Sequence, residues 1–311
     1  MTPPTAGNFG HDRAVDKPRD SVAEPAVADL LDILDLERIE VNIFRGHCPD
    51  EDRQRVFGGQ VMAQSLVAAQ RTVDDDRVAH SLHGYFLRPG DPNAPILYDV
   101  DRIRDGRSFT TRRVVAIQHG RAIFNMAASF QVTEPGGVYQ MPMPDVPNPG
   151  ELTPWADYLA TIVDDFPPEA EAWFNRPRPI ETRPVKLHHP LKGHVEHPPR
   201  QFIWFRTASP VGDDPALHQA LALYAVDMWL LDCSVLAHGY RFGDPDFQAA
   251  SLDHAMWFQR PFRADQWLLL DAEAVSTGGA RGLNRSTIFS VDGDLVASAN
   301  QEGLIRMRSP G

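Results

Sequence analysis

The sequence predicts an α+β protein made of two similar units, and three observations support this prediction. First, the stretch His83 to Pro89 reads H-G-Y-F-L-R-P and is echoed by His254 to Pro261, which reads H-A-M-W-F-Q-R-P. Second, further similar segments lie at the same separation of about 170 residues, as expected for an internal repeat of one structural unit. Third, each half contains one strongly apolar helical segment among several strand-like segments.

Composition limits the classes of function. The chain has 311 residues, of which 42% are hydrophobic and 23% charged, which is typical of a globular protein with room for two modest domains. A net charge of −12 argues against general nucleic-acid binding, because phosphates require a basic surface. Two cysteines, Cys48 and Cys233, are too few for a disulfide framework, so we expect a cytoplasmic protein. The N-terminus lacks the apolar run of a signal peptide or membrane span.

The first half begins with a tail, residues 1–25, which is polar and rich in Pro and Asp and is expected to be disordered. The N-terminal unit, residues 26–135, starts with a predicted strand over 36–45. A helix over 60–69 follows the Gly58-Gly59 pair, and its small and apolar residues predict burial on more than one side. Gly59 would lie at the helix N-terminus, where free N–H groups can bind an oxyanion; a sharply turning loop explains the glycine pair equally well. Four predicted strands complete the unit: 80–87, 96–105, 109–118 and 121–133.

Prolines accumulate in the following stretch, so residues 136–177 are interpreted as a linker with one short helix over 155–163. The C-terminal unit, residues 178–311, then repeats the order of the first. Its predicted helix covers 215–236. Its predicted strands are 180–186, 201–207, 249–258, 267–275, 282–291 and 295–307.

The second helix carries a single carboxylate, Asp227, among apolar residues. Its neighbours one helical turn away include Leu223 and Leu231. A buried carboxylate of this kind needs hydrogen-bond partners or becomes harder to ionise. Either property suits a general base, but a structural Asp that caps a loop would give the same pattern, and both interpretations stay open at this point.

An ordered set of motifs gives the chain a family resemblance. The motifs are F-G-G-Q (57–60), H-S-L-H-G-Y-F-L-R-P-G (80–90), D-H-A-M-W-F-Q-R-P-F (253–262), S-T-G-G-A-R-G (276–282) and V-A-S-A-N-Q-E-G-L-I-R (296–306). Together they resemble the type II acyl-CoA thioesterase family, which comprises the bacterial TesB enzymes and their peroxisomal relatives. The resemblance implies a double hotdog fold, in which two tandem units each wrap a curved antiparallel sheet around a long helix. It also implies hydrolysis of fatty acyl-CoA to free fatty acid and CoA, without a cofactor.

The family is described as activating a water with an Asp, a Thr or Ser, and a Gln. Matched residue by residue, these roles fall on Asp227, Ser251 and Gln301. Serine stands where many relatives have threonine, which keeps the hydroxyl but loses the methyl group that restricts its rotamer. No carboxylate lies in residues 62–70 of the first helix, so we expect one catalytic site per chain.

Three further residues are candidates for substrate binding. The N–H of Gly59 could hold the thioester oxygen, and His254 lies within the matched D-H-A-M-W-F motif. Arg281 is one of five arginines that could include a site for the CoA phosphates, although a solvated surface arginine is the ordinary interpretation. The other four are Arg104, Arg107, Arg112 and Arg285.

Other interpretations compete with the thioesterase. Asp253 and His254 could form the Asp/His pair of a hotdog enoyl-CoA hydratase, although His83 echoes His254 in the unit expected to be inactive. A catalytically silent acyl-CoA-binding protein is a third possibility. A covalent serine mechanism is not expected, because the nucleophile-elbow motif is missing.

Metal binding and assembly are the remaining questions. Four histidines, at 188, 189, 194 and 197, crowd a Pro-rich segment. No carboxylate or cysteine completes a regular ligand spacing there, so no metal is expected. Exposed sheet edges and apolar faces favour pairing between copies, so we expect a homo-oligomer.

Overall fold

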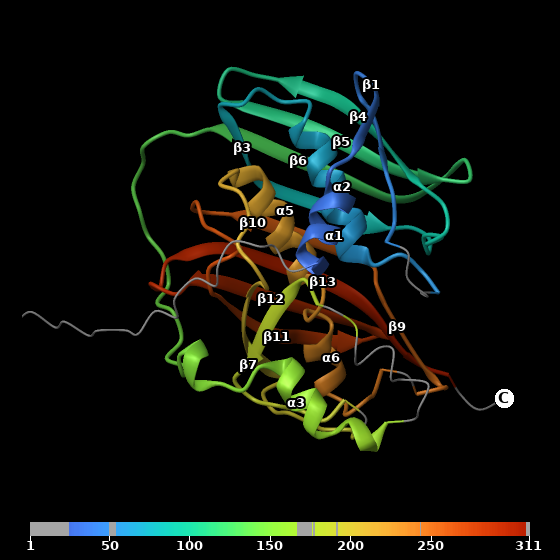
Figure 1. Ribbon diagram of the computed structural model, residues 1–311, viewed down its shortest axis with the longest axis vertical. Helices are drawn as coiled ribbons and strands as arrows, with labels where there is room; N and C mark the ends of the chain where they lie inside the picture. The colour runs from blue at the N-terminus through green and yellow to red at the C-terminus, as the bar shows by residue number, and fades with distance from the viewer. Residues whose placement is uncertain are drawn as a thin grey trace, which may run out of the picture.

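The computed structural model describes residues 25–308 apart from 50–53, 167–175, 177, 191 and 243. The predicted tail therefore lies, except for Pro25, outside the described residues, as does part of the predicted linker. Figure 1 shows the described elements arranged as helices packed against a large curved antiparallel sheet. In chain order they are α1 (Pro25–Leu34), β1 (Glu37–Glu40), β2 (Ile43–Gly46), α2 (Gly58–Gln70), β3 (Arg77–Phe86), β4 (Ile96–Asp105), β5 (Phe109–Gln118), β6 (Arg121–Val132), η1 (Pro149–Glu151), α3 (Trp155–Thr161), η2 (Val163–Asp165), β7 (Ile180–Pro184), β8 (Arg200–Thr207), α5 (Pro215–Val226), α6 (Asp232–Leu236), β9 (Phe247–Ser251), β10 (Asp253–Phe258), β11 (Leu268–Gly278), β12 (Arg281–Ser290) and β13 (Leu295–Met307).

The strand order repeats from one half of the sheet to the other. The path runs β1-β2-β4-β5-β6-β3-β10-β13-β12-β11-β8-β7, with β9 added beside β13. Outward from the centre, β3-β6-β5-β4-β2 is matched by β10-β13-β12-β11-β8, and each set has its helix after the first strand in the chain. The two sets join where β3 pairs antiparallel with β10, and there His83 lies opposite Ala255 while Gly84 lies opposite His254. The two similar segments around His83 and His254 thus pair with each other at the centre of the sheet, and we call this β3–β10 pairing the central seam.

Two helices occupy the middle of the molecule. Helices α2 and α5 lie side by side between the two halves of the sheet in Figure 1, and they pack against each other directly. Every residue of α5 from His218 to Val226 is buried, and α2 is buried along most of its length. The prediction that the first helix is covered on more than one side is therefore confirmed. The main hydrophobic core surrounds this helix pair and includes Met62, Leu66, Leu221 and Leu223.

Several element boundaries differ from the sequence-based predictions. Residues 25–34 form helix α1, which was not predicted; its buried residues recur at helical spacing. The single strand predicted over 36–45 is instead the β1–β2 hairpin, whose turn lies at Val41 and Asn42. The predicted strand 249–258 is interrupted at Leu252, which separates β9 from β10.

The long helix predicted over 215–236 is also interrupted. Helix α5 ends at Val226, Asp227 is its C-terminal cap, and α6 begins only at Asp232. Close packing of α6 on the sheet accompanies this break. A side chain at Gly303 would collide with Leu231, and one at the paired Gly282 would collide with Ser234. Two glycines on adjacent strands therefore leave room for α6.

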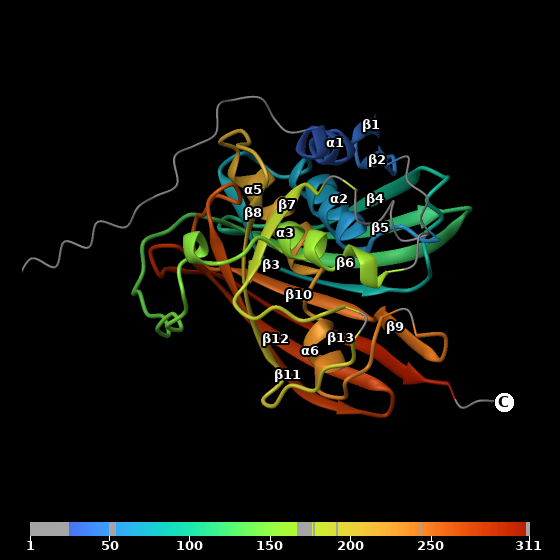
Figure 2. The same cartoon turned by 60° about the horizontal axis from the view of Figure 1, so that its bottom comes forward.

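The segment between the two halves is irregular but attached to the C-terminal half. It leaves β6, runs along one side of the molecule, and reaches α3 beside β7 (Figures 1 and 2). The indole N–H of Trp204 donates to the carbonyl oxygen of Pro147 at 2.9 Å, and Gln140 bonds to the turn before β13. Met143 and Leu152 pack on a small core around Trp204. Helix α3 falls within the short helix predicted over 155–163.

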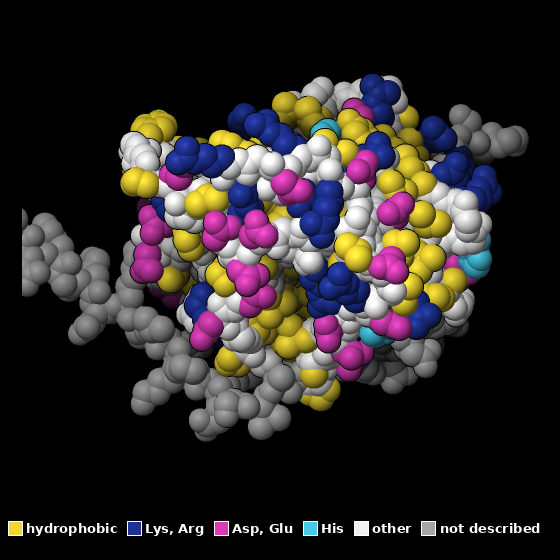
Figure 3. Space-filling view, turned by 90° about the horizontal axis from the view of Figure 1, so that it is seen from above, with side chains coloured by type: hydrophobic (Ala, Val, Ile, Leu, Met, Phe, Trp, Pro, Cys, Tyr) yellow, Lys and Arg dark blue, Asp and Glu magenta, His cyan; other side chains and the backbone are white. Residues whose placement is uncertain are grey.

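The surface carries charges of both signs. On the face above the N-terminal half, Lys and Arg side chains alternate with Asp and Glu (Figure 3). Among the described helices, none is both long and apolar enough to cross a bilayer.

Candidate active site

Four polar side chains from the C-terminal half meet in one buried cluster. The amide nitrogen Nε2 of Gln301 donates to Asp227 Oδ1 at 2.6 Å and to Ser251 Oγ at 3.1 Å. The ring nitrogen Nδ1 of His254 lies 3.5 Å from the same amide nitrogen and 3.7 Å from Asp227 Oδ1. The structure thus brings together the three residues predicted to be catalytic, and adds His254 to them.

Each of these side chains comes from a different element. Asp227 caps the C-terminus of α5, and Ser251 is the last residue of β9. Gln301 occupies an inward position of β13, where buried residues alternate with more exposed ones, and His254 occupies an inward position of β10. Because inward side chains of neighbouring strands share one face, the sheet itself holds Gln301 and His254 against the end of α5.

The cluster is almost completely removed from solvent. The side chain of Asp227 is 3% exposed, and those of His254 and Gln301 are fully buried. A primary amide has only two N–H groups, and Gln301 uses both of them on Asp227 and Ser251. Its carbonyl oxygen Oε1 and His254 Nε2 are buried without a hydrogen-bond partner among the described residues. The site therefore retains buried polar atoms that can bind a polar molecule.

The N-terminus of α2 faces the same carboxylate. A side chain added at Gly58 would lie 2.8 Å from Asp227 Oδ2, so the helix backbone closely approaches this oxygen. A side chain added at Gly59 would lie 2.6 Å from the carbonyl oxygen of Tyr224. The Tyr224 ring also packs edge-on against the Phe57 ring, with centroids 5.1 Å apart. The N-cap residue of α2, Phe57, makes no side-chain capping hydrogen bond to the helix. Gly58 was not singled out from the sequence, because only the packing of α2 on α5 shows which glycine faces Asp227.

Asp253 and His254 do not form a pair. They are adjacent on β10, so their side chains point to opposite faces of the strand. Asp253 Oδ2 bonds to His83 Nε2 at 3.0 Å across the central seam, and its Oδ1 accepts from the N–H of Glu302 at 2.7 Å. The geometry therefore gives no support to the hydratase interpretation.

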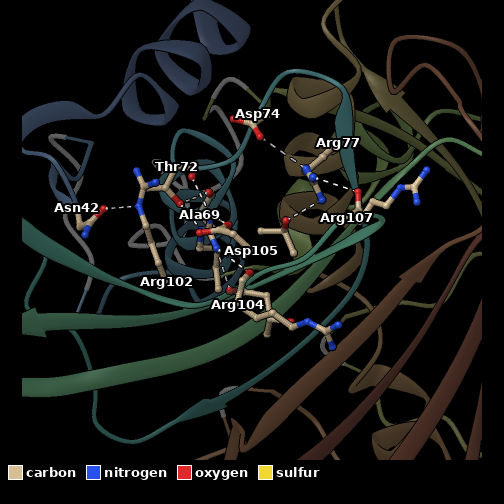
Figure 4. A network of polar contacts seen from close by, with 12 residues as sticks. Asn42, Ala69, Thr72, Asp74, Arg77, Arg102, Arg104, Asp105 and Arg107 are labelled. Carbon is tan, nitrogen blue, oxygen red and sulfur yellow. Dashed lines mark hydrogen bonds and ion pairs between the residues drawn. The ribbon is translucent and has the colours of Figure 1, made fainter.

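The arginines proposed for phosphate binding differ in their surroundings. The Arg112 side chain is 1% exposed and donates to Thr72 and to Asp105, so it holds the fold together. Figure 4 shows the surrounding network, in which Arg77 donates to the backbone carbonyl of Arg107 while the Arg107 guanidinium points away. The Arg281 guanidinium is exposed and donates to Glu302 Oε1 at 2.9 Å. Among the described residues, no hydrogen bond or ion pair joins it to the buried cluster.

Comparison with known proteins connects this geometry to a family. Residues 169–304 match the family model "Acyl-CoA thioesterase", and residues 49–131 match "Acyl-CoA thioesterase N-terminal domain". The chain is 40% identical over 278 residues to "Acyl-CoA thioesterase 2" of Haemophilus influenzae, covering 89% of this chain and 97% of that protein. It is 38% identical over 284 residues to human "Acyl-coenzyme A thioesterase 8", covering 89% and 88% of the two chains.

A solved structure agrees with these matches. The crystal structure of acyl-CoA thioesterase II TesB2 from Mycobacterium marinum superposes with a TM-score of 0.74 at 44% identity, covering 90% of this chain and 99% of that one. A conserved protein with a hot dog fold from Alicyclobacillus acidocaldarius, at 18% identity and a TM-score of 0.71, supports the fold alone. By sequence and by fold, the chain belongs to the type II acyl-CoA thioesterase family.

Proposed function

We propose that this protein hydrolyses fatty acyl-CoA thioesters to free acid and CoA, and that Asp227, Ser251 and Gln301 activate the attacking water. One observation carries the proposal: in a member of this family, the Gln301 amide joins the Asp227 carboxylate and the Ser251 hydroxyl in a buried cluster. A carboxylate held in this way has the position and chemistry of a general base.

In the proposed reaction, water attacks the thioester carbonyl carbon while Asp227 accepts one of its protons. The tetrahedral intermediate then collapses, the C–S bond breaks, and the CoA sulfur leaves as a thiolate that is subsequently protonated. The Ser251 hydroxyl, which can donate to the water oxygen, and the free Oε1 of Gln301, which can accept the second water proton, would orient the water. No bond forms between enzyme and acyl group, so no acyl-enzyme is expected.

We assign stabilisation of the oxyanion to the N-terminus of α2, with the Gly59 N–H as the predicted donor. The absence of a side-chain cap and the approach of the helix to Asp227 support this assignment. Free N–H groups at a helix N-terminus favour negative charge, and they would act where the carbonyl oxygen gains it. His254 is proposed to line the substrate site, since its ring lies beside Gln301.

Arg281 is proposed to bind a CoA phosphate, because its guanidinium is exposed and held by one carboxylate only. Arg281→Ala should then raise the KM for acyl-CoA several-fold and lower kcat less, since phosphate contacts lie far from the reacting carbonyl. Steady-state kinetics measure both constants. An unchanged KM would contradict this assignment.

The repeated strand order supports the finer architecture that we propose, a double hotdog with an N-terminal unit (26–135), a linker (136–177) and a C-terminal unit (178–311). We further propose one active site per chain, because α2 offers no carboxylate equivalent to Asp227. A homo-oligomer and a cytoplasmic location remain predictions from the sequence.

Free-thiol release from a series of acyl-CoA esters of increasing length tests the proposed function. We expect turnover with equal amounts of CoA and free acid, and no initial burst of thiol. Absence of thiol release at every chain length would overturn the proposal, and the same samples can then be tested for hydration of an enoyl-CoA or for acyl-CoA binding without turnover.

A further inference from the structure

A second polar cluster lies away from the buried cluster, at the open side of the C-terminal half. A cavity of about 360 Å³ is formed between strand β8 and the segment 185–198 that precedes it. Its lining includes His188, Glu196, Lys186 and Arg200. Neither the proposed hydrolysis nor the oxyanion site uses any of these residues.

The side chains of His188 and Glu196, which line this cavity, converge with that of His194. One ligand atom from each residue lies within 4.8 Å of those of the other two. The two imidazole rings are 4.5 Å apart between centroids, and His194 Nε2 lies 2.8 Å from Glu196 Oε2. In the part of the chain that the structure describes, no hydrogen bond or ion pair is found at the ring nitrogens of His188, which is half-buried. Glu196 follows His194 by two residues, but the irregular segment between His188 and His194 has no regular spacing that would predict their convergence.

The charges around the cavity do not form a site for an anion. Arg200 donates two hydrogen bonds to Asp271, at 2.7 and 2.6 Å, so its charge is already paired. Lys186 forms an ion pair with Glu196. What remains for a ligand is a pair of imidazoles and one carboxylate, which is the donor set that divalent transition metals prefer.

We propose that His188, His194 and Glu196 bind one divalent transition-metal ion, of the Zn²⁺ class. Zinc ligands lie roughly 3.3 Å apart around a tetrahedral ion with bonds of about 2.0–2.1 Å, so the cluster needs a small contraction. His194 and Glu196 already lie close together. The cavity leaves room for water as a further ligand. Lys186 competes for Glu196, and its side chain is 60% exposed, so it is free to move into solvent when metal binds.

Such a metal would hold the segment 185–198 in one conformation, and this segment already contacts the end of the helix that follows the Asp227 turn. The Glu196 N–H donates to the carbonyl oxygen of Leu236, the last residue of α6, at 3.1 Å. Gly193 lies against the backbone of Gly239, where an added side chain would be 2.7 Å from the carbonyl oxygen. The role is therefore structural, and metal binding should stabilise the fold rather than take part in hydrolysis.

Isothermal titration calorimetry with ZnCl₂ tests the proposal on chelator-treated, tag-free full-length protein at pH 7.5. We expect one Zn²⁺ per chain, at least about tenfold weaker binding for each of His188→Ala, His194→Ala and Glu196→Gln, and stronger binding for Lys186→Met, which removes the competing charge. His189→Ala is the matched control, because His189 bonds to Asp165 and is not part of the cluster. It should bind as the native protein does.

Thermal unfolding with and without Zn²⁺ gives a second readout that does not depend on activity. Zinc should raise the Tm of the native protein and of His189→Ala, and should raise that of His194→Ala by less at the same Zn²⁺ concentration. A native protein that shows no saturable Zn²⁺ binding would overturn the proposal. So would binding that all three cluster variants retain, because the metal would then be held elsewhere. Neither result would affect the assignment of Asp227.

Discussion

At the scale of single residues, Gln301 organises the candidate active site. Its two N–H groups point to Asp227 and Ser251. Because Gln301 lies at an inward-facing position of β13, the strand holds both hydrogen bonds in place. A shorter or apolar side chain at this position would leave a buried carboxylate without its donor, which costs on the order of 1–3 kcal/mol or more. The same bonds that stabilise the cluster therefore also aim the carboxylate.

Ser251 gives a matched pair of substitutions at this scale. Ser251→Thr keeps the hydroxyl that meets Gln301, whereas Ser251→Ala removes it. We expect Ser251→Ala to lower kcat roughly tenfold, because one hydrogen bond to the water is lost, and Ser251→Thr to stay near the native rate. Steady-state thiol release measures both. Equal rates for the Ala and Thr variants would show that the hydroxyl has no role in turnover.

The predicted site residues that the structure brings together are those marked by their own surroundings or by motifs in the sequence. Asp227 stands alone among apolar residues, and Gln301 and Ser251 are found through motifs. The contribution of Gly58 could not be predicted, because it depends on the packing of α2 against a helix about 160 residues away in the sequence. Glu196 lies two residues after His194 in the sequence, but only the path of the folded segment shows that both side chains lie beside His188.

At the scale of elements, two helix ends face each other: the uncapped N-terminus of α2 and the C-terminus of α5 with Asp227. Sequence periodicity located both helices but not the end of α5. The break at Asp227 arises from tertiary packing, because α6 turns onto Gly282 and Gly303 of the sheet. Local apolar character continues through the break, so periodicity alone predicts one long helix.

Gly58→Ala tests the contact between these two helix ends. The added methyl group would lie 2.8 Å from Asp227 Oδ2 and 3.0 Å from the Phe86 ring, so the carboxylate must shift. We expect kcat to fall roughly tenfold or more, because small displacements of a general base are costly. Gly212→Ala is the control, since its side chain would meet open space. If the Gly58→Ala enzyme is as active as this control, the close approach of α2 to Asp227 has no role in turnover.

His218 makes the stability of α5 depend on pH. Its Nδ1 accepts a hydrogen bond from the Ala264 N–H at 3.0 Å, and its ring is 2% exposed. Burial lowers the pKa of His218 below its usual value of 6.5. Because the pKa of His218 is lower in the folded state, the unfolded chain binds a proton at this histidine at a higher pH than the folded chain does. The stabilisation is therefore complete above pH 6.5 and is lost as the pH falls from there toward the folded-state pKa.

Urea unfolding at pH 7.5 and 5.5 measures this effect. The free energy of unfolding of the native protein should fall by on the order of 1 kcal/mol more than that of His218→Asn, whose amide oxygen can still accept from Ala264 but does not titrate. Comparing the two proteins removes the contribution of the other histidines. An identical pH dependence in both would exclude a role for His218.

At the scale of the whole molecule, the two halves of the chain form one sheet, and both border the candidate active site. The β3–β10 pairing joins them, and the His83–Asp253 contact crosses this seam. The N-terminal half supplies α2 with Gly58 and Gly59, whereas the C-terminal half supplies Asp227, Ser251 and Gln301. The repeat in the sequence predicted this two-part organisation, because matching motifs mark matching strands. Their pairing across the centre could not be predicted, since register between distant strands leaves no local signal.

The central claim is that Asp227 is the general base for thioester hydrolysis, and the most direct measurement is kcat for thiol release by Asp227→Asn. Asp232→Asn is the matched control, because Asp232 is a nearby half-buried carboxylate whose pKa is raised to about 7 by desolvation and which makes no described contact with the cluster. We predict that Asp227→Asn lowers kcat at least about 100-fold with a native unfolding transition, while Asp232→Asn remains near the native rate. A folded Asp227→Asn protein with native turnover would contradict the account.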